Sequence, residues 1–102
     1  MENLFEYTKP SPQEEELASQ LFGCKNVRIE RIVSTGQESG WYDQDEDEWV
    51  CLLRGSAALE YADGEEVSLQ AGDMVFLPAH KRHRVSRTSQ DPECLWLCVF
   101  VK

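Results

Sequence analysis

Most of the chain consists of short apolar segments separated by turn signals at a spacing of about ten residues. In residues 57–61 every second side chain is apolar, and Asp63 and Gly64 then supply a tight hairpin turn. Residues 67–69 alternate again, and Pro78 ends the segment that follows. This spacing predicts seven or so short strands, which is typical of an all-β sandwich or barrel.

Two of the predicted strands are apolar on both faces, at residues 49–53 and 95–101. A single small barrel covers only the inner face of each strand with its own core. The outer faces therefore need the N-terminal segment or a second subunit, and the pattern predicts a homodimer built on sheet surfaces. In the first strand, Ile32 and Val33 break the alternation, which predicts a β-bulge near Glu30 and Arg31.

The N-terminal segment, residues 1–26, carries the signals of a helix over residues 12–22. Ser11 is a favourable N-cap, Pro12 suits the first helical position, and Glu14 completes a capping box. Gly23 supplies a C-terminal stop. We therefore expect a short α-helix followed by a β-barrel over residues 27–102, in one domain overall.

The charge balance narrows the possible partners. The 102 residues include 10 Lys and Arg against 19 Asp and Glu, a net charge of −9. Such acidity disfavours nucleic acid and anionic membranes. No apolar run approaches the ~20 residues of a membrane span, and the N-terminus lacks a secretory signal pattern. The four cysteines show no C-x-x-C spacing. We expect a small soluble protein of the cytoplasm.

Two charged runs stand out, and each lies at the end of a predicted strand. Residues 43–48 hold five acids, and residues 80–84 hold both histidines of the chain among three basic residues. One interpretation is that the runs only neutralise each other at the surface, which contributes little stability. The other is that they line the rim of one functional site.

The spacing of these runs favours the second interpretation. The first stretch places five residues at set intervals: Gly36, Tyr42, Gln44, Glu48 and Gly55. The second stretch does the same with another five: Gly72, Pro78, His80, His83 and Arg87. Over residues 36–87, half of the chain, this resembles the two motifs of the cupin superfamily, G-x5-H-x-H-x3/4-E-x6-G and G-x5-P-x-G-x2-H-x3-N. The resemblance implies a mostly-β small cupin, a double-stranded β-helix with a jelly-roll-like barrel.

In cupins the histidines and the glutamate of these motifs hold a divalent metal. Here Tyr42 and Gln44 stand at the two histidine positions of the first motif, whereas Glu48 and His83 are retained. The resemblance implies that Gln44, Glu48 and His83 hold Zn, Mn, Fe or Ni, with His80 or water completing the shell. The competing interpretation is a barrel mouth that lost its metal and kept its polar groups for hydrogen bonding.

Strand parity adds a further expectation. Side chains two residues apart share one face, so Arg87 points into the barrel if His83 does. A buried arginine needs a partner, which is either Glu48 or the carboxylate or phosphate of a ligand. Trp41 and Tyr42 flank the predicted site and are candidates for the wall of a ligand pocket.

Three functions are compatible with these residues. The first is a metal-dependent enzyme acting on a small polar or anionic molecule, with His80 as general acid/base and Tyr42 as a donor to the substrate. The second is a metal-free binding or sensing module for a small molecule. The third is a structural domain that dimerises.

Overall fold

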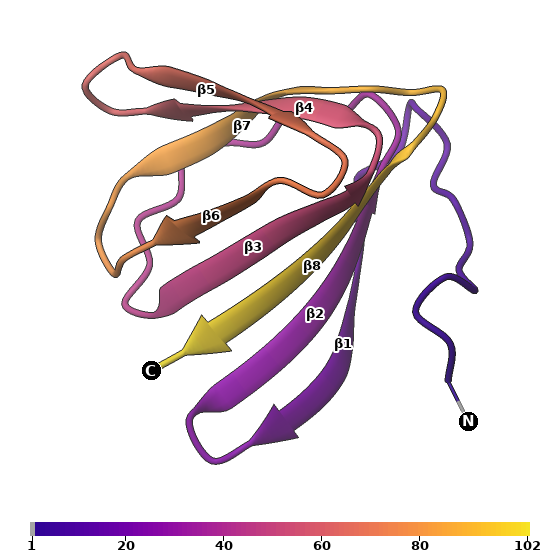
Figure 1. The fold of residues 1–102 in the computed structure, drawn as a ribbon. Coiled ribbons are helices and arrows are strands. Elements are labelled where there is room, and N and C mark those ends of the chain that lie inside the picture. The colour runs from indigo at the N-terminus through magenta and orange to yellow at the C-terminus, as the bar shows by residue number, and fades with distance from the viewer. Residues whose placement is uncertain (1) are drawn as a thin grey trace.

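The computed structural model describes residues 2–102 and consists of two antiparallel sheets. Eight strands follow one another along the chain: β1 (Leu17–Cys24), β2 (Val27–Ser34), β3 (Asp47–Arg54), β4 (Ser56–Tyr61), β5 (Glu66–Gln70), β6 (Met74–Leu77), β7 (His83–Thr88) and β8 (Cys94–Val101). The larger sheet has the order β1-β2-β8-β3-β6 and the smaller has the order β5-β4-β7. The two sheets approach each other at one end and spread apart at the other (Figure 1). The predicted mostly-β, barrel-like fold is confirmed.

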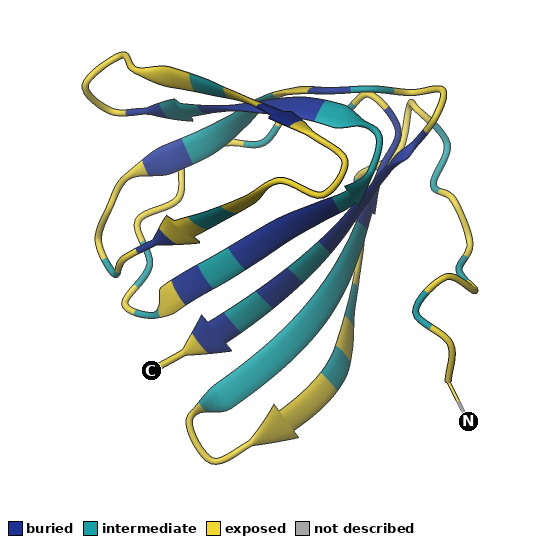
Figure 2. Ribbon diagram, viewed as in Figure 1, coloured by how far each residue is buried: buried dark blue, intermediate teal, exposed yellow. Residues whose placement is uncertain are grey.

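The core lies between the two sheets, where the inward side chains of both meet. Its buried members come from several strands and include Leu52, Leu59, Leu77 and Trp96. β3, β4 and β8 are largely buried, whereas β1 at the sheet edge is largely exposed (Figure 2). The even-numbered side chains of β2, β3 and β8 share the face that looks toward the smaller sheet, as strand periodicity requires.

The predicted helix over residues 12–22 is wrong. The part of the chain that the structure describes contains no helix, and hence none that could cross a membrane. One half of the capping box does form, because the backbone N–H of Ser11 donates to the Glu14 carboxylate at 3.0 Å. The backbone N–H of Glu14 donates to the Ser11 backbone carbonyl at 2.9 Å, which closes a single turn. The turn is not propagated, because residues from Leu17 onward pair with β2 along an open sheet edge.

The predicted bulge near Glu30 and Arg31 is also misplaced. β2 pairs with β8 without interruption from Val27 to Ser34. The irregularity lies in the neighbouring strand β1, between Gln20 and Phe22, opposite the middle of β2. Ile32 and Val33 are both apolar because β2 is covered on both of its faces. One of the two side chains faces the core and the other faces the outer side of the sheet.

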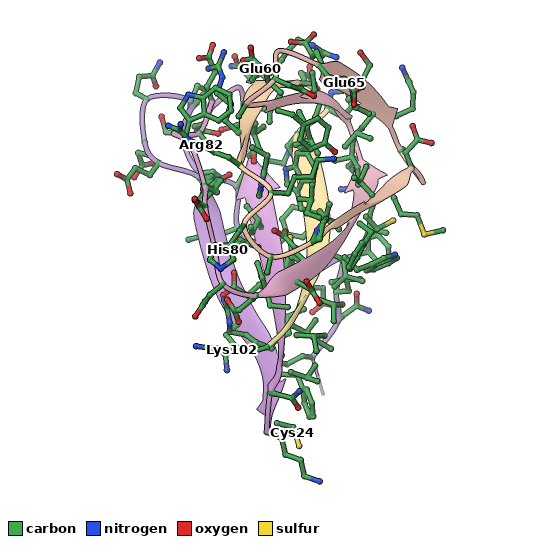
Figure 3. All side chains as sticks on the ribbon, turned by 90° about the vertical axis from the view of Figure 1, so that its left-hand side faces the viewer. Cys24, Glu60, Glu65, His80, Arg82 and Lys102 are labelled. Carbon is green, nitrogen blue, oxygen red and sulfur yellow. The ribbon has the colours of Figure 1, made fainter. Side chains whose placement is uncertain are left out.

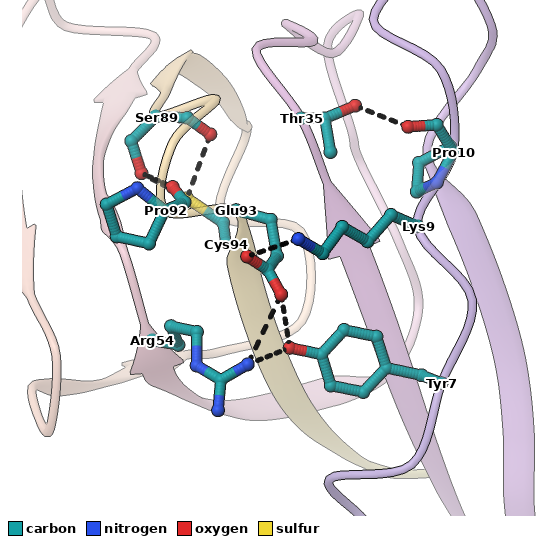
Figure 4. A network of polar contacts seen from close by, with 9 residues as sticks. All are labelled: Tyr7, Lys9, Pro10, Thr35, Arg54, Ser89, Pro92, Glu93 and Cys94. Atoms are coloured by element: carbon teal, nitrogen blue, oxygen red, sulfur yellow. Dashed lines mark hydrogen bonds and ion pairs between the residues drawn. The ribbon is translucent and has the colours of Figure 1, made fainter.

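The N-terminal segment lies along the outer side of the larger sheet and is anchored by one buried carboxylate (Figures 1 and 4). Glu93 is 5% exposed and accepts the phenol hydrogen of Tyr7 at 2.6 Å. Arg54 donates to the same carboxylate oxygen at 3.2 Å and also bonds the Tyr7 oxygen, while Lys9 pairs with the other oxygen at 3.5 Å. These contacts lower the pKa of Glu93 to about 2, with the Tyr7 hydrogen bond as the largest cause.

Candidate functional site

The spread end of the two sheets encloses a cavity of about 280 Å³. Its polar lining consists of Glu16, Arg28, Glu30, Tyr42, Gln44, Glu48 and His83. Its apolar lining consists of Ala18, Ile32, Val50, Leu59, Leu77, Val85, Trp96, Cys98 and Phe100. Four of the predicted site residues therefore meet in one place: Tyr42, Gln44, Glu48 and His83.

The acidic segment before β3 is bound to the connection between β6 and β7, which places these four residues. Tyr42 and His83 exchange two backbone hydrogen bonds, of 2.7 and 3.1 Å. The Asp47 carboxylate accepts the backbone N–H of Ala79 at 2.8 Å, and the N–H of His80 donates to the Gln44 carbonyl at 2.7 Å. The two charged runs of the sequence are therefore neighbours at the rim of the cavity.

His80 stands at this rim and not in the cavity lining. Its Nδ1 lies 2.8 Å from the Asp43 carboxylate, and its side chain is 69% exposed. Figure 3 shows it on the same side of the molecule as Lys102, whose amine pairs with Asp45 at 2.9 Å. Its φ of 65° is left-handed, as suits a position where the cupin motif has glycine. The acid/base role predicted for His80 stays a prediction.

Arg87 does not share the face of His83, so the parity argument fails. The pairing of β4 with β7 shifts register between Ala58 and Leu59, and this leaves Ser86 as an extra residue in β7. His83 and Val85 line the cavity, whereas Arg87 is exposed and donates to the Ala57 carbonyl at 3.3 Å. Glu48 consequently has no contact with Arg87.

Trp41 also lies outside the cavity lining. The residue is 43% exposed, and its ring packs against two guanidinium groups, with the Cζ atoms of Arg82 and Arg84 at 5.2 and 5.5 Å from the ring centroid. Arg84 in turn pairs with Glu60 at 2.6 Å on β4. Trp41 therefore contributes to a surface cluster beside the mouth.

Among the charged side chains of the site, Glu48 is the most buried. It is 8% exposed, and its Oε1 accepts the Gln44 amide N–H at 3.0 Å. Burial raises the pKa of Glu48 above its usual value, and the hydrogen bond from Gln44 opposes this rise. The Cys98 thiol also hydrogen-bonds the Glu48 carboxylate, and this contact likewise opposes the rise. Glu48 lines the cavity, and no side-chain N or O atom in residues 2–102 is both fully buried and without a partner.

His83 is oriented by its backbone neighbour. It is 4% exposed, and its Nδ1 lies 2.9 Å from the Lys81 carbonyl oxygen. A carbonyl only accepts hydrogen bonds, so Nδ1 carries the hydrogen and Nε2 of the neutral ring is an acceptor. The described residues supply no partner for Nε2, which points into the cavity beside the ring of Tyr42, with the two ring centroids 5.5 Å apart.

Three polar lining residues were missed by the sequence argument: Glu16, Arg28 and Glu30. Arg28 bonds the carboxylates of Glu30 and of Glu46, the latter at 2.7 Å, and stacks over Phe100 at 4.1 Å. Glu16 accepts the hydroxyl hydrogen of Ser34 at 3.1 Å, and burial raises its pKa. The available signal was that Arg28 and Glu30 share strand parity with the core residue Ile32.

The sequence and the fold have clear relatives. Residues 30–100 match the family model described as "Cupin domain". The chain belongs to the cupin family. A protein from Ralstonia eutropha JMP134, whose proposed activity is that of a mannose-6-phosphate isomerase, is 38% identical over 100% of this chain and 97% of its own, with a TM-score of 0.89.

More distant cupins share the fold alone. A cupin superfamily protein from Desulfitobacterium hafniense DCB-2 is 18% identical over 97% of this chain and 95% of its own, with a TM-score of 0.76.

Among curated proteins, the RCS-specific HTH-type transcriptional activator RclR of Escherichia coli (strain K12) is 36% identical over 47 residues. That match spans 46% of this chain and only 16% of the activator.

Cupins commonly bind divalent metals, but the donors of this cavity fit such an ion poorly. No group of three or more His, Cys, Asp or Glu side chains in residues 2–102 is arranged to hold one. Of the predicted ligands, Gln44 turns its amide nitrogen toward Glu48, so only Glu48 and His83 offer strong donor atoms. Firmly held metals usually have three or four protein ligands.

Proposed function

We propose that this cupin binds a small organic molecule in the barrel cavity, with Glu48 and His83 as its main polar contacts. The observation that carries the proposal is that two polar side chains, Glu48 and His83, are each at least nine-tenths buried and still line the open cavity, where the described residues supply no partner for His83 Nε2. Ligand pockets typically place a few such polar groups in a mostly apolar wall, so this arrangement supports a ligand site.

The walls support an organic ligand rather than a bare ion. Apolar side chains such as Val50, Leu59 and Leu77 surround the polar end, and the volume of about 280 Å³ is near the lower limit of ligand pockets. A metal-free binding module, the second function compatible with the sequence, is therefore favoured over a metal-dependent enzyme. The similarity to part of a transcriptional activator is compatible with a binding or sensing role.

The test is a small-molecule screen by thermal shift, repeated on Glu48→Gln. This variant keeps the size of the side chain and removes its charge. We expect compounds that raise the Tm of the native protein and have a smaller effect on the variant. The matched control is Glu60→Gln, because Glu60 pairs with Arg84 outside the cavity. A screen with no hits, or hits unaffected by Glu48→Gln, would contradict the proposal.

The predicted Zn, Mn, Fe or Ni can be tested on the same preparation. With only two strong donors, we expect less than about 0.1 metal per chain in protein purified without chelator, and no gain in Tm when each ion is added. Elemental analysis measures the content. One equivalent of metal that is lost in His83→Ala would instead favour the metalloenzyme.

The activity proposed for the Ralstonia relative involves a sugar phosphate, and this cavity is poorly suited to one. Arg28 is the only Lys or Arg among its lining residues, and two glutamates already engage its guanidinium. An anionic phosphate would also meet the carboxylates of Glu16 and Glu48. We expect mannose 6-phosphate neither to raise the Tm nor to be isomerised.

We place this function in the cytoplasm. The four cysteines are unpaired, and three of them, Cys51, Cys94 and Cys98, are buried in the sheets. Free thiols are typical of a reducing compartment. Fractionation of the native host would test this placement.

A further inference from the structure

The cavity offers several hydrogen-bond acceptors. The Glu48 carboxylate oxygens accept, and Nε2 of the His83 ring accepts in the tautomer that carries its hydrogen on Nδ1. The Gln44 amide uses a hydrogen of its nitrogen on Glu48, so its oxygen is a third acceptor. A ligand that satisfies these atoms must bring N–H or O–H donors of its own.

The fixed charges of the cavity select among such donors. Three carboxylates line it: Glu30 on β2, Glu48 on β3, and Glu16 directly before β1. They lie close enough together that all three add to the effect of burial in raising the pKa of the central Cys98 thiol. The single guanidinium, that of Arg28, is engaged by Glu30 and by Glu46. The excess of negative charge favours a cation and opposes an anion.

The aromatic walls of the cavity are also compatible with a cationic ligand. The guanidinium of Arg28 stacks over Phe100 at 4.1 Å, so one ring of the lining already has a cation on its face. The rings of Trp96 and Tyr42 also belong to the lining. Trp96 donates its indole hydrogen to Ser34 at 3.1 Å, and this fixes the ring orientation. Rings of this kind attract organic cations and pack against hydrocarbon groups.

We propose that the ligand is a small organic cation with N–H donors, an alkyl or aryl ammonium or amidinium, whose nitrogen lies between Glu48 and His83 and whose hydrocarbon part packs against the apolar wall. This inference rests on the proposed function and specifies its ligand class. A bare metal ion would satisfy the acceptors but leave the apolar part of a cavity of about 280 Å³ without a partner.

The experiment compares matched probes by calorimetry at constant pH and salt. Each set has one hydrocarbon group and three head groups: benzylammonium, benzyl alcohol and phenylacetate, and likewise for butyl and cyclohexylmethyl. We expect the ammonium member to bind at least tenfold more tightly than the alcohol, and the carboxylate not to bind. Glu48→Gln should lower ammonium affinity about tenfold and leave alcohol affinity within about twofold, whereas Glu60→Gln should change neither.

The outcomes separate this inference from the proposed function. Alcohols or carboxylates that bind as tightly as the ammonium members overturn the ligand class and leave the binding cavity intact. Zn²⁺ or Mn²⁺ that displaces a bound ammonium and binds more tightly than any probe also overturns it. If no member of any set binds, and the broad screen is empty too, both proposals fail.

Discussion

The buried carboxylate of Glu93 holds the N-terminal segment through Tyr7, Arg54 and Lys9. Its folded-state pKa is about 2, below the ordinary 4.5, so protons favour the unfolded chain. The stability that it contributes is fully present above about pH 4.5 and is lost as the pH falls through about 2. Tyr7→Phe removes a hydrogen bond to a charged group.

We expect Tyr7→Phe to lower the free energy of unfolding at pH 7 by about 1.5–3 kcal/mol. The deficit should shrink as the pH falls toward about 2, because Glu93 is protonated there in the native protein and the same bond weakens. Urea unfolding at pH 7 and at about pH 2 measures both values. A deficit that is equal at the two pH values would show that the packing of the ring, and not the bond, matters.

The charge of Glu48 affects the stability of the fold in the opposite direction from that of Glu93. Burial raises its folded-state pKa, so the cost of keeping it charged is present above that raised pKa and disappears as the pH falls below the unfolded value. We expect Glu48→Gln to raise the free energy of unfolding of the ligand-free protein at pH 7 by about 0.5–2 kcal/mol, while weakening ligand binding. Thermal unfolding at pH 7 and pH 4 checks this; destabilisation at pH 7 would contradict it.

At the scale of elements, one extra residue in β7 decides which side chains reach the cavity. Ser86 interrupts the pairing with β4, so Arg87 lies on the outside although His83 lies inside. We therefore expect Arg87→Ala to change ligand affinity less than about twofold and stability by less than about 0.5 kcal/mol. Calorimetry and urea unfolding measure these. A tenfold loss of affinity would restore Arg87 as a ligand contact.

The N-terminal segment shows a similar contest between local and long-range structure. The capping signals at Ser11 and Glu14 are satisfied by a single turn. The following residues pair with β2 instead, because the sheet offers a row of backbone partners and an apolar face. Sequence signals that span only three or four residues do not predict an edge strand of this kind.

At the scale of the whole molecule, the homodimer predicted from the sequence stays a proposal. Exposed apolar side chains on the outer face of the larger sheet support it. Met74 and Phe76 on the edge strand β6 are 63% and 59% exposed, and Phe22 on the opposite edge strand β1 and Val101 on β8 are also exposed. The chain carries a net charge of −9, so two copies meet most favourably on an uncharged surface. We propose that a second copy of this chain covers this face.

The expected mass in light scattering is twice that of one chain, and Phe76→Glu should reduce it to that of one. Glu60→Gln again serves as the control, because Glu60 lies on the smaller sheet. A monomer at concentrations of about 100 μM would contradict the proposal, since stable dimers bury large apolar areas.

The sequence by itself determined the antiparallel β architecture, the cupin motifs, and the meeting of Tyr42, Gln44, Glu48 and His83. Period-two alternation and turn residues act locally, and motif spacing transfers between relatives. Only the tertiary structure decided that residues 17–24 form a strand, that Arg87 faces outward, and that Glu16, Arg28 and Glu30 line the cavity. Those outcomes depend on strand partners far away in the chain, and one extra residue in a strand reverses the face of every side chain beyond it.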